Sequence, residues 1–193
     1  AGWQLAEWIV EGEPTIDMMG VDPRRFGTYA TRGYLRQKTE EAYANVFTVH
    51  YPDEERTAAR PLKRAPCYDR MKALGAVFGS VYGWERPNWF APEGFGIDAD
   101  KLDKPDVILN HNHPEPADDG KVKEVWSFRR PNYFTQVGDE ARHVHEQVGL
   151  LDMSAFSKFE VWGPGAEAWL DSLVANRLPK KIGRIGLAHH LTP

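Results

Sequence analysis

Hydrophobic and polar side chains alternate along three segments in the last third of the chain. The alternation covers residues 125–130, 156–162 and 185–191, and a period of two is typical of a strand with one covered face. A last strand without a partner would leave a bare edge, which soluble domains rarely tolerate. The pattern therefore predicts three strands and suggests that the sequence stops inside an unfinished hairpin of a larger polypeptide.

Two amphipathic segments separate these strands and are expected to be helices. The first follows Asp139, a residue type that caps helices, and ends at Gly149. The second begins at Pro164, which suits the first turn of a helix, and carries its hydrophobic stripe along residues 169–174. The order strand, helix, strand, helix, strand predicts an α+β fold.

The N-terminal segment has the periodicity of an amphipathic helix. Leu5, Trp8 and Ile9 fall at positions i, i+3 and i+4, so they share one face. Gly12 and Pro14 follow and are expected to end the helix.

Residues 28–80 are expected to be helical, with one polar side. The hydrophobic face of a first helix consists of Leu35, Ala42, Tyr43, Val46 and Phe47. After a turn-rich stretch, a second helix is expected to carry Tyr68, Met71, Leu74 and Val77. Further along, residues 95–120 are rich in Asp, Pro, Asn and Gly and are expected to form an exposed insertion.

The composition is that of a globular chain, and it excludes some classes of partner. The 193 residues are 41% hydrophobic and 27% charged, and a net charge of −4 leaves no basic footprint for nucleic acid. No apolar run approaches the roughly 18 residues that a membrane span needs. Cys67 is the single cysteine, so nothing points to an oxidising compartment. We expect a cytoplasmic protein, or one of the mitochondrial matrix if the source is eukaryotic.

The C-terminal third carries a resemblance to a known family. The run 148–161 (VGLLDMSAFSKFEV), then 163–166 (GPGA) and 173–176 (LVAN), resembles the opening of the aminomethyltransferase domain. The glycine-cleavage T-protein and the dimethylglycine and sarcosine dehydrogenases share that folate-binding domain.

Earlier runs of the sequence are similar to the dehydrogenase branch of this family. These are 82–90 (YGWERPNWF) and 127–132 (SFRRPN). Residues 1–9, together with 12–14 and 22–26, resemble the end of the flavin domain of these FAD-dependent enzymes. The resemblance extends over nearly the whole chain in the order of the family.

The resemblance implies three parts: the end of an FAD-dependent oxidoreductase domain (1–27), a central connector (28–80) and an incomplete aminomethyltransferase-like folate-binding domain (81–193). It also implies FAD and tetrahydrofolate as cofactors of the complete protein. The flavin domain would oxidise an N-methyl group of a small amino acid, and tetrahydrofolate would receive the one-carbon unit. The Gly-x-Gly-x-x-Gly fingerprint of dinucleotide binding does not occur in the sequence, so this chain alone is not expected to hold FAD.

On the flavin side, the resemblance places Ala1, Gly2 and Trp3 near the flavin ring. The N-terminus of a helix carries unpaired backbone N–H groups and the positive end of the helix dipole, which stabilise an anionic reduced flavin. The alternative is an amphipathic helix that only packs on a core.

On the folate side, Asp152, Met153 and Phe156 match the loop that lines the pterin pocket in the family. Asp152 can equally cap the following turn, and Phe156 can be an ordinary core residue. A tyrosine that the family often has corresponds to Leu187 here, which weakens the expectation of efficient one-carbon transfer. No catalytic residue is identified.

The segment 84–89 is expected to be a loop at a junction between domains. Trp84 and Trp89 flank Glu85 and Arg86, which indicates an aromatic junction with a charge pair. An arginine there can clamp the carboxylate of a substrate, or it can form an interdomain ion pair under the indole rings.

Neither a metal site nor a nucleophile is predicted. His143 and His145 are two positions apart on an expected helix and point in different directions, and His189 and His190 lie on opposite faces of an expected strand. Cys67 has no catalytic motif around it.

Two classes of function remain open. The first is an enzyme, a section of an FAD-dependent dehydrogenase for dimethylglycine, sarcosine or a similar N-methyl amino acid. The second is a non-catalytic, folate-domain-like binding or assembly module. In both cases the expected partners are a small molecule and the remainder of the polypeptide or other subunits, without nucleic acid or membrane.

Overall fold

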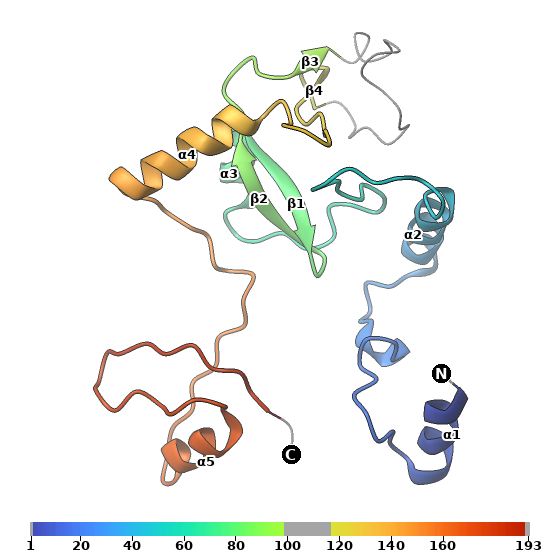
Figure 1. Cartoon of the computed structure of the whole chain (residues 1–193), viewed down its shortest axis with the longest axis vertical. Helices are drawn as coiled ribbons and strands as arrows, with labels where there is room; N and C mark the ends of the chain where they lie inside the picture. The colour runs from blue at the N-terminus through green and yellow to red at the C-terminus, as the bar shows by residue number, and fades with distance from the viewer. Residues whose placement is uncertain (1, 99–116, 192–193) are drawn as a thin grey trace. The chain divides into compact units, whose positions relative to one another are not determined.

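The computed structural model describes residues 2–98 and 117–191, so Ala1 and most of the insertion expected at 95–120 lie outside the described residues. The chain divides into two units, Ala1–Ala155 and Phe156–Pro193. The described residues form helices and small antiparallel sheets (Figure 1). The predicted α+β class is therefore confirmed at this level.

The N-terminal helices lie where the periodicity of the sequence predicts them, but Val46 and Phe47 of the expected hydrophobic face lie beyond the end of α2 and are exposed. Helix α1 (Gly2–Glu11) ends at Gly12, whose φ of 86° turns the chain away. A short 3-10 helix, η1 (Pro23–Arg25), is capped by the side chain of Asp22. Helix α2 (Arg32–Ala44) begins at Thr31, whose hydroxyl accepts a hydrogen bond from the Tyr34 N–H at 3.3 Å.

The second helix of the connector is shorter than predicted. Helix α3 (Tyr68–Ala73) ends before Val77, because Gly75 adopts a φ of 88° and leads the chain into strand β1 (Ala76–Val81). β1 pairs antiparallel with β2 (Trp84–Phe90), as Figure 1 shows. The prediction of a loop at 84–89 is therefore wrong, since these residues belong to β2.

Two local features explain the shape of this hairpin. Val77 pairs with Trp89 and Phe78 pairs with Pro87, so Asn88 is an extra residue in β2. Bulges of this kind accommodate proline, which has no N–H to donate. At the tip, Tyr82 (φ 50°) and Gly83 (φ 80°) form a two-residue turn in which both residues have positive φ. For a tyrosine this conformation costs about 1–3 kcal/mol.

A segment from the connector extends the hairpin at the edge of β2. Lys63 forms a parallel bridge with Trp84. The Lys63 N–H donates to the carbonyl of Gly83, and the Glu85 N–H donates to the carbonyl of Lys63, both at 2.9 Å. The outer backbone of β2 is therefore paired at this point.

The prediction of a strand at 125–130 is wrong. Strand β3 (Ile97–Asp98) pairs with β4 (Lys121–Val122), and the ladder stops there. Val122, Glu124 and Trp126 are buried in alternation, so the period of two marks an extended segment packed on the core. Its backbone is held by a side chain instead, since the Val125 N–H donates to Oδ1 of Asn132 at 2.8 Å.

Helix α4 (Phe134–Glu146) begins five residues before the expected cap at Asp139, which lies inside the helix. α4 packs beside β2, where Oε1 of Glu140 accepts a hydrogen bond from the Phe90 N–H at 2.7 Å. The buried core next to this contact consists of Trp89, Ala91, Trp126 and Tyr133.

The second unit contains helix α5 (Ala166–Leu173), which starts two residues after the expected Pro164, behind Gly165 in the left-handed region. The strands expected at 156–162 and 185–191 do not form in its described residues. The pairing there is one antiparallel bridge between Val174 and His190. A strand needs a ladder partner for its backbone groups, and hydrophobic alternation alone does not supply one.

Candidate functional site

A buried ion pair joins the connector to the hairpin. Glu85 on β2 has a side chain only 3% exposed, and it accepts two hydrogen bonds from Arg60, from Nε at 3.0 Å and from Nη2 at 2.6 Å. Arg60 Nη2 also donates to the carbonyl of Phe78 at 2.8 Å, opposite Pro87 in the ladder. Burial alone would lower the pKa of Arg60, but the bonds and charge of Glu85 outweigh it and raise that pKa.

A second buried carboxyl group, that of Glu124, lies on the extended segment after β4. Its Oε1 accepts a hydrogen bond from Nε1 of Trp89 at 3.0 Å. Asn132 holds the backbone on both sides of it, accepting from the Val125 N–H and donating to the carbonyl of Lys123 at 3.1 Å. Burial raises the pKa of Glu124, and the negative charge of Glu55 adds to the effect.

Tyr133 completes this cluster. Its ring stacks on Trp89 with centroids 5.1 Å apart and an angle of 15° between the planes. Burial and the charge of Glu124 raise the pKa of Tyr133 to about 12. The cluster contains acids and one guanidinium but no activated nucleophile.

A cavity of about 180 Å³ opens beside the cluster. Its walls include Glu55, Arg60, Lys123, Glu124 and Trp126. The Nε1 atom of Trp126 is buried and has no hydrogen-bond partner among the described residues. A cavity of this size has room for a few ordered water molecules, each of which takes about 30 Å³.

The residues predicted at 84–89 do not form one site. Trp89 is in the core at 1% exposure, whereas Trp84 is partly exposed, with Nζ of Lys63 5.8 Å from its ring centroid. Glu85 is paired with Arg60. Arg86 lies opposite Gly79 in the ladder.

Arg60, Glu124, Asn132 and Tyr133 were not predicted from the sequence as members of a site. The alternation of Val122, Glu124 and Trp126 was the available signal for Glu124. A charged residue in phase with two hydrophobic ones falls on the covered face of an extended segment, where a carboxyl group needs a hydrogen-bond partner.

On the flavin side, Gly2 and Trp3 form the first turn of α1, while Ala1 lies outside the described residues. Apart from its chain neighbours and the backbone of α1, no heavy atom of the described residues lies within 4 Å of the position that a Cβ on Gly2 would take. Trp3 is 77% exposed, and its Nε1 donates to the carboxylate of Glu7.

On the folate side, Oδ1 of Asp152 accepts a hydrogen bond from the Ser154 N–H at 2.8 Å, which is the turn-capping arrangement. Met153 and Phe156 are about half exposed, and Leu187 is exposed. Phe156 begins the second unit.

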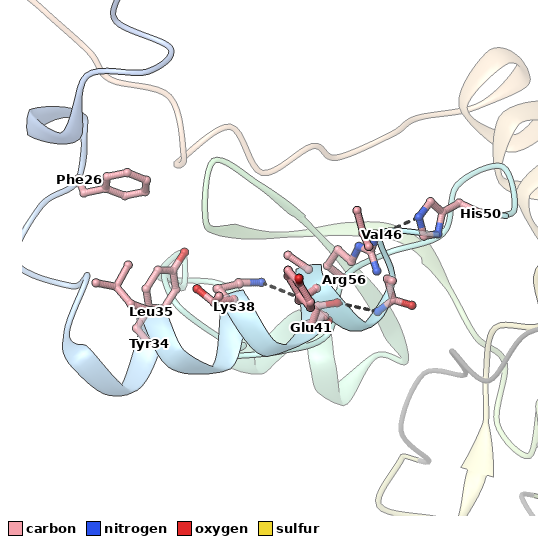
Figure 2. Close-up of a pocket in the computed structure, with 12 residues that line it drawn as sticks. Phe26, Tyr34, Leu35, Lys38, Glu41, Val46, His50 and Arg56 are labelled. Carbon is pink, nitrogen blue, oxygen red and sulfur yellow. Dashed lines mark hydrogen bonds and ion pairs between the residues drawn. The ribbon is translucent and has the colours of Figure 1, made fainter. Parts of the chain in front are cut away.

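A groove of about 730 Å³ runs along α2, as Figure 2 shows. Its charged side chains contact one another: Lys38 lies 3.7 Å from Glu41, and Arg56 lies 3.1 Å from Nε2 of His50. Glu41 also accepts hydrogen bonds from the backbone N–H groups of residues 57 and 58. The groove therefore offers mainly apolar surface.

Residues 2–98 and 117–191 contain no group of three or more His, Cys, Asp or Glu side chains that could hold a metal ion. None of the helices in this part of the chain is long and apolar enough to cross a membrane.

Comparison with known families places two domains on the chain. The family described as the FAD dependent oxidoreductase central domain matches residues 11–65, and the family described as the GCVT N-terminal domain matches residues 67–193. The second match spans more than half of the sequence, so the chain belongs to the GCVT N-terminal domain family.

Individual relatives point to the same group of proteins. Mitochondrial dimethylglycine dehydrogenase of Rattus norvegicus is 34% identical over 192 residues, which is 100% of this chain and 19% of the relative. The 4-methylaminobutanoate oxidase (formaldehyde-forming) of Paenarthrobacter nicotinovorans is 35% identical over 166 residues, 86% of this chain and 17% of the relative.

A third relative is named as a regulatory subunit, whereas the first two are named as enzymes. The mitochondrial pyruvate dehydrogenase phosphatase regulatory subunit of Mus musculus is 31% identical over 188 residues, 96% of this chain and 19% of the relative. The chain thus spans about a fifth of the length of these curated relatives. The predicted resemblance to the dimethylglycine and sarcosine dehydrogenase family is confirmed.

Proposed function

We propose that this chain is a section of an FAD-dependent oxidoreductase that demethylates a small N-methyl amino acid and passes the one-carbon unit to tetrahydrofolate. The observation that carries the proposal is the order of the two family matches, in which an oxidoreductase central domain is followed directly by a GCVT N-terminal domain. Two relatives named for the oxidation of N-methyl amines support it.

On the flavin side, the residues assigned to the cofactor are Ala1, Gly2 and Trp3. FAD, when bound, takes up the two electrons that leave the N-methyl group. The first turn of α1 offers backbone N–H groups and the positive end of the helix dipole to the negative charge of the reduced ring.

On the folate side, Asp152, Met153 and Phe156 are assigned to tetrahydrofolate, the acceptor of the one-carbon unit. The carboxylate of Asp152 suits the amino and N–H groups of a pterin. The half-exposed side chains of Met153 and Phe156 offer apolar surface to its ring.

The segment with Trp84, Glu85, Arg86 and Trp89 is assigned an interdomain role. The ion pair of Glu85 with Arg60 supports this role, because Arg60 lies in the residues matched by the central domain and Glu85 in those matched by the GCVT domain. The joint holds the two matched regions in a fixed contact.

The proposed subcellular location depends on whether the host is eukaryotic or bacterial. The matrix of the mitochondrion is proposed for a eukaryotic host, in keeping with the relatives whose names include this organelle. The cytoplasm is proposed for a bacterial host.

The test uses the full-length protein, purified and scanned for flavin absorbance. Dimethylglycine, sarcosine or 4-methylaminobutanoate should bleach the flavin band without oxygen, and tetrahydrofolate should suppress formaldehyde release. If none of the three amines reduces the flavin of the loaded protein, the assigned substrate class is contradicted.

A second candidate is a non-catalytic binding or assembly module. The similarity to a regulatory subunit over nearly the whole chain favours it. A full-length protein without flavin, which co-purifies with another enzyme, is the expected result in that case.

A further inference from the structure

A second cavity, separate from the Arg60 cluster, lies between the 19–34 segment and the tip of the β1–β2 hairpin. Its volume is about 530 Å³, within the range of small-molecule sites. The lining residues are Met19, Gly20, Arg25, Phe26, Tyr29, Tyr34, Leu62, Lys63, Tyr82 and Gly83. Four aromatic rings and two cations dominate this wall, and the lining includes no carboxylate.

The two cations lie against aromatic rings. The guanidinium carbon of Arg25 is 4.4 Å from the ring centroid of Phe26, and Nζ of Lys63 is 5.2 Å from that of Tyr29. Among the described residues, no carboxylate lies within ion-pair distance of either side chain. The neighbouring Arg24, by contrast, pairs with Asp22 at 2.7 Å. The cavity therefore carries positive charge that the described part of the chain does not neutralise.

The backbone at the rim is also unusual. Tyr82 is 94% exposed and has a φ of 50°, which bulky side chains rarely adopt. Asparagine, aspartate or glycine would fit that turn position without strain. Strained backbone conformations cluster at ligand-binding sites, and this one lies in the lining of the cavity.

We propose that this cavity binds a planar aromatic ligand that carries a phosphate or carboxylate group. The rings of Tyr29, Tyr34 and Tyr82 offer surfaces for stacking, and Lys63 and Arg25 pair with the anionic group. A nucleotide and a folate-type carboxylate share this chemistry. The site goes beyond the proposed function, and its test needs no turnover.

The experiment is photoaffinity labelling of the full-length, flavin-loaded protein with 8-azidoadenosine 5′-monophosphate, followed by peptide mapping. We expect the label on peptides that contain Tyr29, Tyr34 or Tyr82. Adenosine monophosphate and 5-formyltetrahydrofolate are the competitors. Protection by the first alone identifies a nucleotide site, and protection by the second alone identifies a site for folate-type carboxylates.

Charge-matched variants test whether the cavity binds the label. Lys63→Gln and Arg25→Gln should each reduce labelling about tenfold, the loss expected for one charge-assisted hydrogen bond. Arg64→Gln and Arg24→Gln remove the same charge next to these positions and should leave labelling unchanged. Labelling spread over other peptides, an equal loss in the control variants, or protection by neither competitor would overturn the proposal. Circular dichroism checks that each variant is folded. If one of the two cavity variants does not fold, the labelling of the other decides the test.

Discussion

Trp89 donates its indole N–H to Oε1 of Glu124 across 3.0 Å, although 35 positions separate the two residues along the chain. Both are buried, and Tyr133 stacks on the same indole. This contact fastens β2 to the extended segment after β4. The hairpin and that segment therefore share one core.

Removal of this hydrogen bond should destabilise the fold. Trp89→Phe keeps an aromatic ring in the core but leaves the buried carboxyl group of Glu124 without its donor. We expect a loss of about 1–3 kcal/mol in the free energy of unfolding, measured with urea and circular dichroism. Trp162→Phe, at an exposed position, is the control and should change it by less than about 0.5 kcal/mol. Equal losses in the two variants would contradict the role of the bond.

Neutralising Glu85 should have a larger effect. Glu85→Gln leaves the buried charge of Arg60 uncompensated, which costs about 3–5 kcal/mol. The double variant Arg60→Met/Glu85→Leu removes both charges and should recover much of this loss. Glu40→Gln breaks an exposed pair with Arg36 and should cost less than about 1 kcal/mol. A double variant as unstable as Glu85→Gln would argue against an uncompensated charge.

The stability of the protein should carry a pH dependence from Glu124. Burial raises the pKa of this carboxyl group above its ordinary value of 4.5 in the folded chain. The folded chain then holds the proton more tightly than the unfolded chain. The free energy of unfolding therefore falls as pH rises from 4.5 through the folded-state pKa.

Glu124→Gln tests this dependence, because it removes the titration and keeps an oxygen that can accept from Trp89. The variant should gain stability relative to the parent protein as pH rises through that window, and the gain should level off above it. Urea unfolding at a series of pH values measures the difference. A difference that is constant with pH would rule out the proton linkage.

Gly75 should not tolerate a side chain. A Cβ at this position would lie 2.2 Å from the carbonyl oxygen of Ala91, and the φ of 88° is itself unfavourable for alanine. We expect Gly75→Ala to cost about 2–4 kcal/mol in thermal or urea unfolding. Gly94→Ala has a similar φ of 75° but open space around it, and should cost about 1 kcal/mol. Equal losses of stability in the two variants would mean that the backbone shifts to relieve the clash with the Ala91 carbonyl.

Asp152→Asn should separate the two halves of the proposed reaction. The variant can retain the turn that Ser154 N–H forms with the side chain, but it loses the negative charge. We expect tetrahydrofolate to bind about tenfold more weakly, with an unchanged rate of flavin reduction by the amine. Asp171→Asn changes a carboxylate with a similar backbone contact to Leu178 and serves as the control. Slower flavin reduction would show that the effect of Asp152 is not confined to folate.

The presence of the helices could be predicted from the sequence because their signals are local, although α3 ends and α4 begins earlier than expected. The stripe of Leu5, Trp8 and Ile9, for example, lies within the helix that it specifies. Strand pairing is not local. Pro87 and Asn88 read as loop residues, yet they lie at a bulge that the partner strand accommodates.

The candidate site shows the same limit. The sequence motif drew attention to Glu85, but its partner Arg60 lies 25 positions earlier, in the residues matched by another family. The adjacent Arg86 was the nearer choice by sequence alone. A buried pair depends on which segments pack together, and only the folded chain shows that.

The bridge between Lys63 and Trp84 has a consequence for solubility. An open strand edge is a template on which a second chain can pair, and such pairing begins aggregation. The connector covers the edge of β2 at this point with its own backbone. A version of the GCVT region made without the residues around Lys63 would expose that edge, so recombinant material truncated there should precipitate more readily than the intact chain.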